Sequence, residues 1–359
     1  MRNSNQGLRT EGFELRNANR AYSQTKQHQA APSSTQERLV SWLEWRTRTK
    51  CVILEHMGEK FSGEYILSQF VSTRSHAFRV GNRFADPGDK LVKVSTQWAL
   101  PSFVVEGMPW YQRRWATAVA HGRSGTSRVL MGRSAGRVLG MWVIGTWPNE
   151  VVEIATPNMS PPPKHKWAPG AVQRKAQLAQ GDVVVKHDVR VTSPVRTAVD
   201  IARLHGFREG LVALDWLLRS TKYSKQNVAA CINSLGRAKG INTARRCLKY
   251  AVDTSESPYE SFARAILIEA GLVLRTQEWV LGGVRTDLFT DPSVCVEVDG
   301  DGKYKDTPGL TIQEERARER RMLNAGFAVV RTTPKELHQV PAKFVDDVRR
   351  AIARQQRAA

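Results

Sequence analysis

Two acidic residues near the C-terminus have the spacing of a site for phosphodiester chemistry. Glu297 and Asp299 alternate with valines in the apolar run 294–299, which predicts a short β-strand. Because side chains alternate between the two faces of a strand, both carboxylates share one face with Cys295, and the valines line the other. Two carboxylates on one face of an apolar strand are costly to bury unless something compensates them.

A third carboxylate, Asp287, lies on the preceding predicted strand, 284–289, and a short turn at 291–293 folds that strand back. The turn brings Asp287 beside Glu297 and Asp299. Three converging carboxylates repel one another, and a hard divalent cation such as Mg²⁺ or Mn²⁺ relieves the repulsion. Such an ion also activates a water and stabilises the charge that develops on a scissile phosphate.

This pattern predicts a metal-dependent nuclease with Asp287 and Glu297 as metal ligands. In the alternative interpretation, the acids lie solvated at a sheet edge or pair with arginines. The sequence offers three arginines for such pairs: Arg318, Arg321 and Arg331.

Further side chains near these strands are candidates for the same site. Glu260 is a candidate metal ligand, although Ser257-x-x-Glu260 is equally well a capping box at a helix start. Lys303 and Lys305 follow Gly300, where a lysine orients a metal-bound water or neutralises a phosphate, or is simply solvated. The remaining candidates are Glu315 and Arg318, which face the site or form a surface ion pair, and Gln277, interpreted as an ordinary strand residue.

The elements that position these residues follow the order α-β-β-β-α-β-α. A helix starts at Pro258 and stops before Gly271. Predicted strands at 273–281, 284–289 and 294–299 follow, then a charged helix at 313–325 and a strand at 327–332. Phe344, Val348 and Ile352 recur at four-residue spacing in a last amphipathic helix.

The rest of the chain divides into three expected parts. Residues 1–33 have the composition of a disordered, basic leader. A capping-box pattern at 34–37 opens segment 34–109, where a helix-turn-helix near 58–80 competes with an ordinary amphipathic helix. Segment 110–250 mixes helices with short strands, and residues 253–257 resemble a linker.

Composition points to a polyanionic partner. The formal net charge is +20 and the pI about 10.2, which favours nucleic acid, and no apolar run is long enough to cross a membrane. Four scattered cysteines without a CxxC pair, and the absence of a secretory signal, predict reduced thiols in the cytoplasm. Oligomeric state is left open, a homodimer included. The basic run at 245–249 supplies candidate phosphate contacts: Arg245, Arg246 and Lys249.

The C-terminal motifs resemble a known family. Ser257-Pro258-Tyr259-Glu260, Arg285-Thr286-Asp287-Leu288, Val296-Glu297-Val298-Asp299-Gly300 and Gly326-Phe327-Ala328-Val329-Val330-Arg331 resemble the actinobacterial domain related to the very-short-patch-repair endonuclease, within the PD-(D/E)XK superfamily. The resemblance covers about residues 254–340.

That resemblance implies a restriction-endonuclease-like αβββαβ core and an activity in DNA repair or phage defence. It implies metal-ligand roles for Asp287 and Glu297, a neighbouring role for Asp299 and a helix carboxylate role for Glu260. The superfamily's Glu-x-Lys motif here ends in Asp299, and Lys303 is the candidate substitute for the lysine.

Residues 110–220 resemble the antitoxin or regulator domain of abortive-infection toxin–antitoxin systems. The matching pieces are Gly132-Arg133-Ser134-Ala135-Gly136, Val151-Val152-Glu153-Ile154 and the run Val191–Asp200. In such proteins a winged-helix domain precedes this segment, in the place of residues 34–109.

The fold expected is therefore mixed α/β. A winged-helix segment and an α+β domain precede a nuclease domain at 254–359. The function expected is a Mg²⁺-dependent endodeoxyribonuclease. Two alternatives remain: a non-catalytic DNA-binding regulator with a degenerate nuclease fold, and, more weakly, an RNA-processing nuclease.

Overall fold

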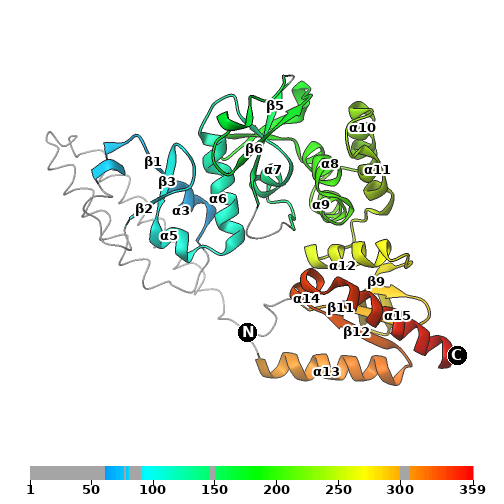
Figure 1. Cartoon of the computed structure of the whole chain (residues 1–359). Helices are drawn as coiled ribbons and strands as arrows, with labels where there is room; N and C mark the ends of the chain where they lie inside the picture. The colour runs from blue at the N-terminus through cyan, green and yellow to red at the C-terminus, as the bar shows by residue number, and fades with distance from the viewer. Residues whose placement is uncertain are drawn as a thin grey trace, which may run out of the picture. The chain divides into compact units, whose positions relative to one another are not determined.

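The computed structural model describes residues 61–76, 78–80, 90–144, 150–157, 159–299 and 308–358, with the backbone alone for 308–315. The leader at 1–33, the capping box at 34–37 and the loop that carries Lys303 and Lys305 lie outside the described residues. From Phe61 onward the chain belongs to one compact unit. It is a mixed α/β structure with three sheets (Figure 1).

The first described part is a small sheet with two short helices. Helix α3 (Gly63–Ser68) begins where the Ser62 hydroxyl accepts a hydrogen bond from Tyr65 N–H, at 3.1 Å. Strands β1 (Val71–Ser72), β2 (Leu91–Lys93) and β3 (Trp98–Pro101) form an antiparallel sheet in the order β1-β3-β2, and α5 (Ser102–Gly107) follows. Helix α3 lies within the stretch 58–80, where a helix-turn-helix or an ordinary amphipathic helix was expected, and it ends at Ser68.

The second part is a five-stranded sheet in the order β6-β5-β4-β8-β7. Its apolar core lies between the sheet and helices α6 and α7 and includes Leu130, Ile154 and Val191. The short strands expected in segment 110–250 are present. The elements are α6 (Trp110–Arg123), β4 (Val129–Leu130), α7 (Gly132–Leu139), β5 (Val152–Pro157), η2 (Lys164–Lys166), β6 (Ala171–Ala176), η3 (Gln180–Asp182), β7 (Val183–Lys186) and β8 (Val189–Thr192).

Four helices come next: α8 (Pro194–His205), α9 (Phe207–Ser220), α10 (Lys225–Leu235) and α11 (Ile241–Tyr250). Ser193 precedes Pro194 at the N-terminus of α8, where proline suits the first helical position. Gly210 lets α9 approach α8 and α11 closely. A Cβ atom there would lie 2.5 Å from the Cα of Ala202 and 2.8 Å from the Sγ of Cys247. A helix interior normally disfavours glycine, so close packing decides this position.

We therefore expect Gly210→Ala to lower the free energy of unfolding by about 1–3 kcal/mol, although alanine is the better helix former. The matched control is Gly282→Ala, because a Cβ at Gly282 meets nothing within 4 Å. Urea denaturation of both variants measures the difference. Equal stability of the two variants would contradict the close-packing explanation.

The C-terminal part has the expected element order with one addition. Helix α12 (Pro258–Glu269) precedes strands β9 (Arg275–Leu281), β10 (Val284–Thr290) and β11 (Val294–Val298). Helix α13 (Pro308–Asn324), strand β12 (Ala328–Thr332) and helix α15 (Pro341–Ala358) complete the order. The short helix α14 (Pro334–Gln339), which was not predicted, lies before α15. The sheet order is β12-β11-β10-β9, with β11 parallel to β12 and the other pairs antiparallel.

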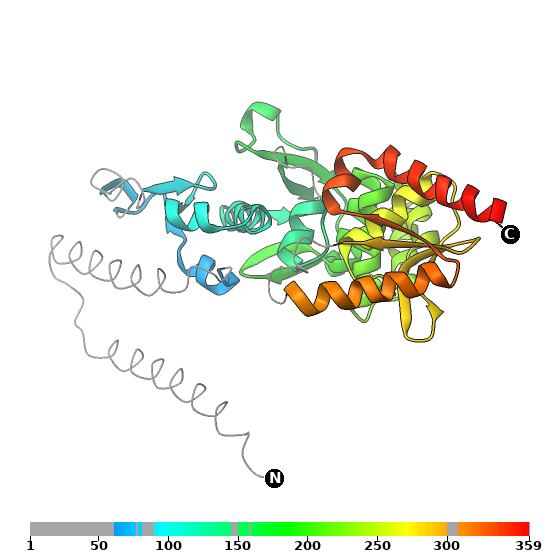
Figure 2. The same ribbon diagram turned by 90° about the horizontal axis from the view of Figure 1, so that it is seen from below.

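The two faces of this sheet are covered by different helices. Leu288, Val296 and Val298 pack with residues of α12, α14 and α15. Phe289 and Cys295 pack on the other face with Met322 of α13. Figure 2 shows the strands between α13 on one side and α15 on the other. The predicted alternation along 294–299 is confirmed, and the face of Cys295 is the one that α13 covers.

No helix in the described part of the chain is long and apolar enough to cross a membrane. The described cysteines are free thiols, namely Cys231, Cys247 and Cys295.

Candidate functional site

Asp287 and Glu297 lie side by side on neighbouring strands. The antiparallel register pairs Leu288 with Val296 and Phe289 with Cys295, so Asp287 and Glu297 each lie one residue beyond the end of the ladder. Glu297 is on the face that α13 covers, where it pairs with Arg318 of that helix. The Asp287 carboxylate is near enough to Glu297 to act on its ionisation.

The strands β10 and β11 stop pairing at this point. Leu288↔Val296 is the last pair of the ladder. Beyond it, the side chain of Asp287 accepts a hydrogen bond from the backbone of β11. Its Oδ2 accepts a hydrogen bond from Val298 N–H at 2.9 Å. The carboxylate thus lies between the separating strands, where it is half-buried.

Glu297 is a buried carboxylate with an arginine partner. Its side chain is 7% exposed and accepts hydrogen bonds from Arg318 of α13, at 2.9 Å to Oε1 and 3.3 Å to Oε2. The same guanidinium donates to the backbone carbonyl of Arg285. Arg318 therefore does face the site, as one interpretation expected, and it is held there by Glu297.

Glu260 caps the start of α12 and also contacts β9. Ser257 Oγ accepts from Glu260 N–H, and Glu260 Oε2 accepts from Glu256 N–H at 2.8 Å, so the capping interpretation is correct in kind. The same Oε2 accepts from Gln277 Nε2 at 2.9 Å. Gln277 lies within β9, as predicted, and its φ of 53° is in the left-handed region.

Electrostatics connect the three carboxylates through Asp287. Burial, and then the neighbouring Asp287 carboxylate, raise the pKa of Glu297, while Arg318 opposes the rise. Burial and Asp287 also raise the pKa of Glu260. The Asp287 carboxylate is thus near enough to Glu297 and Glu260 to disfavour the ionisation of both, in addition to the larger effect of burial.

Asp299 does not join this group. Arg331 of β12 binds it with both ends of the guanidinium, at 2.7 and 2.5 Å. The prediction that Asp299 converges on the metal with Asp287 and Glu297 is therefore not supported, because the parallel strand β12 supplies a closer cation.

Other candidates fall outside this cluster. Lys303, Lys305 and the side chain of Glu315 lie outside the described residues. Arg245, Arg246 and Lys249 are on α11, which packs against α8 and α9. Among the described residues, no group of three or more His, Cys, Asp or Glu side chains is arranged to hold a metal ion.

Two side chains that the sequence reasoning missed lie next to the site on the β9–β10 hairpin. Arg285 and Trp279 are cross-strand partners, with the guanidinium 5.8 Å from the ring centroid. Trp279 is 67% exposed, and Arg285 also pairs with Glu256. A tryptophan two residues beyond Gln277 in a polar strand was the available signal.

The raised pKa of Glu297 gives a test of the metal-free site. The folded protein holds this proton more tightly than the unfolded chain does. The stabilisation is therefore complete below about pH 4.5 and is lost as pH rises through the raised pKa. Between pH 4.5 and 7 we expect the free energy of unfolding of the wild type to fall, compared with that of Glu297→Gln. The fall should be about 1.4 kcal/mol for each tenfold increase in the proton affinity of Glu297 on folding.

Urea denaturation in a chelator-containing buffer measures this difference at each pH. Glu260→Gln should show the same sign, because the pKa of Glu260 is raised by the same causes. A wild type that gains stability over both variants as pH rises would show that the carboxylates are not coupled as described.

Comparison with known proteins adds little to this geometry. Two uncharacterized proteins from two strains of Mycobacterium tuberculosis are each 23% identical to this chain over 167 residues. The match takes in 45% of this chain and 62% of each relative, so the chain spans less than two thirds of the length of these relatives. No family model matches the sequence. No solved structure matches it either.

Proposed function

We propose that residues 254–359 form a restriction-endonuclease-like domain that hydrolyses phosphodiester bonds in DNA with Mg²⁺ or Mn²⁺. One observation supports this most: the Asp287 carboxylate lies where the pairing of β10 and β11 ends, near enough to Glu297 and Glu260 to act on both. Two neighbouring carboxylates that are partly or fully buried are costly, and a divalent cation would offset their mutual repulsion.

The residues present fit a hard divalent cation. Mg²⁺ needs only one or two protein carboxylates, because water and phosphate oxygens complete its coordination. Asp287 and Glu297 would hold the ion, with Glu260 as a third carboxylate near Asp287. When bound, the ion supplies a reactive water at neutral pH and stabilises the charge on the phosphate.

The chain's own cations would serve the same reaction. Arg318 neutralises Glu297 in the metal-free protein, which keeps the buried carboxylate compatible with the fold. Lys303, which follows β11 in the sequence, is the proposed substitute for the lysine of the Glu-x-Lys motif and would orient the water. The net charge of +20 favours a nucleic-acid substrate.

Cleavage of DNA by the purified full-length chain tests this proposal. Plasmid, nicked and mismatched DNA are incubated with Mg²⁺, Mn²⁺ or EDTA, and products are separated on gels. Cleavage with either metal and none with EDTA is the expected result. No cleavage of any substrate under any condition would overturn it.

A second candidate function is a non-catalytic DNA-binding regulator. Its support is that Arg318 and Arg331 already neutralise Glu297 and Asp299, so the fold does not require a metal. A regulator binds DNA equally well with and without divalent ions and protects a defined site from nuclease digestion. Calorimetric titration with Mn²⁺ distinguishes the two candidates. If the protein is the nuclease, the wild type should bind Mn²⁺ and Glu297→Ala should not.

A further inference from the structure

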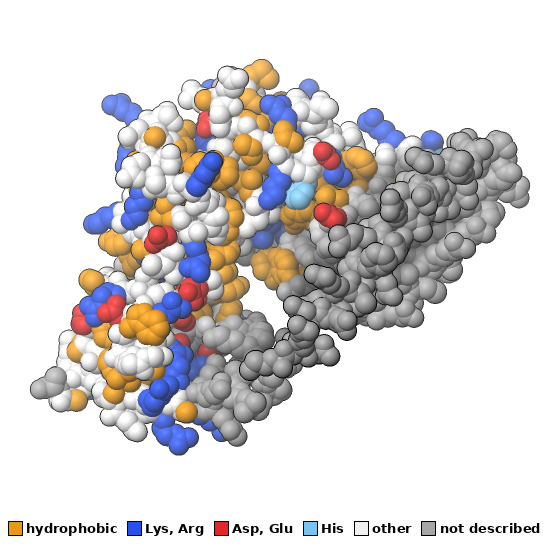
Figure 3. Space-filling view, turned by 180° about the vertical axis from the view of Figure 1, so that it is seen from behind, with side chains coloured by type: hydrophobic (Ala, Val, Ile, Leu, Met, Phe, Trp, Pro, Cys, Tyr) orange, Lys and Arg blue, Asp and Glu red, His pale blue; other side chains and the backbone are white. Residues whose placement is uncertain are grey.

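The helical hairpin formed by α10 and α11 concentrates positive charge. Residues 221–250 contain no Asp or Glu. Lys and Arg side chains are spread over the face of the molecule that Figure 3 shows, with Asp and Glu at fewer places. The charged side chains of the hairpin itself are therefore all positive. Its seven cations are Lys222, Lys225, Arg237, Lys239, Arg245, Arg246 and Lys249.

The cations of α11 all lie on its outer face. Ile241, Ala244 and Cys247 are buried in the helical core. The residues at the complementary helical positions are exposed, namely Asn242, Arg245, Arg246 and Lys249. Among the described residues, the hairpin cations form no ion pairs. Like charges one turn apart, such as Arg245 and Lys249, destabilise a helix by a few tenths of a kcal/mol, so this face is not explained by stability.

Neighbouring groups hold these side chains in place. Arg245 Nη1 donates to Asn242 Oδ1 at 2.8 Å, and the Arg246 guanidinium lies 4.2 Å from the centroid of the Phe207 ring. Lys249 Nζ lies 5.3 Å from the ring centroid of Tyr250. Each arginine keeps further N–H donors for an incoming acceptor. Ordering the cations beforehand reduces the entropy that binding would otherwise cost.

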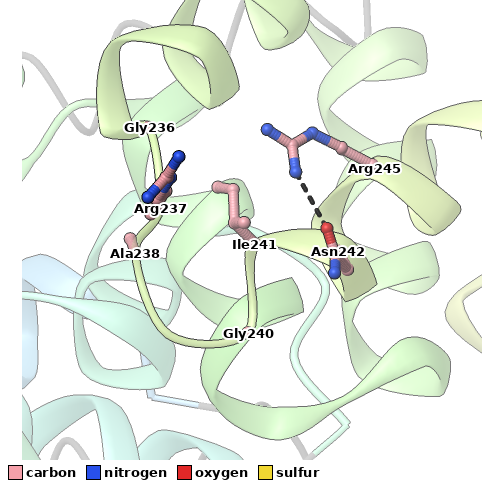
Figure 4. Close-up of a pocket in the computed structure, with 7 residues that line it drawn as sticks. All are labelled: Gly236, Arg237, Ala238, Gly240, Ile241, Asn242 and Arg245. Atoms are coloured by element: carbon pink, nitrogen blue, oxygen red, sulfur yellow. Dashed lines mark hydrogen bonds between the residues drawn. The ribbon is translucent and has the colours of Figure 1, made fainter.

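The loop between the two helices forms a hollow of about 440 Å³. Figure 4 shows the side chains of Arg237 and Arg245 on either side of Ile241, one from the loop and one from α11. Only glycine fits at position 240, because a Cβ there would lie 2.0 Å from the carbonyl oxygen of Arg203, and the φ of Gly240 is +77°. An open hollow between two arginines is accessible to a phosphate group of a larger ligand.

We propose that this basic hairpin binds the phosphate backbone of double-stranded DNA. One phosphate would occupy the hollow between Arg237 and Arg245, and Arg246 and Lys249 would contact the strand further along α11. The inference deepens the proposed function, because it names the surface that holds the substrate. It concerns binding alone, so it can fail separately from the metal chemistry.

The chemistry of the face favours duplex DNA over other anionic partners. A membrane-surface helix inserts its apolar face into lipid, but the apolar face of α11 is already buried. Single-strand binders present aromatic rings for base stacking, and the exposed residues of α11 are an amide and three cations. Sequence-independent contact with backbone phosphates needs only such ordered cations.

The test is fluorescence anisotropy of a labelled 30-base-pair duplex with the full chain in EDTA, over a range of salt concentrations. The variant Arg245→Gln/Arg246→Gln/Lys249→Gln should reduce the log–log salt slope by about 2–3 and weaken binding about a hundredfold at 0.1 M salt. A second variant, Arg237→Gln, should reduce the slope by about 1.

The matched control is Lys164→Gln/Lys166→Gln/Lys175→Gln, which removes the same charge from exposed positions elsewhere. It should keep the wild-type slope. Wild-type affinity in the α11 variant, or an equal loss in the control, would overturn the proposal. Tighter binding of labelled single strands or of phosphatidylserine vesicles than of the duplex would also overturn it. Far-UV circular dichroism verifies that every variant is folded.

Discussion

Replacing Asp287 with asparagine should reduce metal-dependent cleavage of DNA by about a thousandfold, the equivalent of about 4 kcal/mol of transition-state stabilisation. The change keeps the shape of the side chain and removes the charge that faces both Glu297 and Glu260. Initial rates on plasmid DNA with saturating Mg²⁺ or Mn²⁺ measure the effect.

The control for this variant is Asp291→Asn, the same chemical change in the adjoining turn. Asp291 is 74% exposed and pairs with Arg275, so its loss should leave the rate unchanged within about twofold. Duplex binding in EDTA should be retained by both variants. If Asp287→Asn cleaves DNA at the wild-type rate, Asp287 has no role in the reaction, and the proposed metal site is wrong.

Arg264→Met should lower the free energy of unfolding by about 3–5 kcal/mol, because it leaves the charge of Asp215 buried without a partner. Arg264 Nη2 donates to Asp215 at 2.6 Å, and the two side chains are 4% and 0% exposed. Nη1 donates to the Tyr250 carbonyl at 2.7 Å. The pair thus joins α9, the end of α11 and α12.

Two further variants show whether the loss of stability in Arg264→Met comes from the unpaired buried charge. Arg208→Met breaks the more exposed Arg208–Glu269 pair and should cost at most about 1 kcal/mol. The double variant Asp215→Leu/Arg264→Met removes both buried charges and should recover much of the loss. Urea denaturation gives all the values, and a cost no larger in Arg264→Met than in Arg208→Met would contradict this account.

The Asp215 network also changes the interpretation of residues 253–257. The sequence there resembles a linker, yet Asp215 accepts hydrogen bonds from Val252 N–H at 2.9 Å and from Ser255 Oγ at 3.3 Å. Glu256 in addition pairs with Arg285. Local composition could not reveal this, because the partners come from α9 and β10, far away in the sequence.

The sequence by itself determined the element order of the C-terminal part and the face of each residue in 294–299. Both follow from local periodicity and turn chemistry, which act over a few residues. The same local logic put Asp287 and Glu297 together, since a short turn between antiparallel strands leaves little freedom in register.

Only the tertiary structure decided which side chain contacts each carboxylate. Arg318 of α13 pairs with Glu297 and Arg331 of β12 pairs with Asp299, whereas Glu260 accepts a hydrogen bond from Gln277 of β9. These choices depend on which elements pack against the strand ends, and no periodicity encodes them. A charge pattern shows that compensation is required, whereas long-range packing selects the partner that provides it.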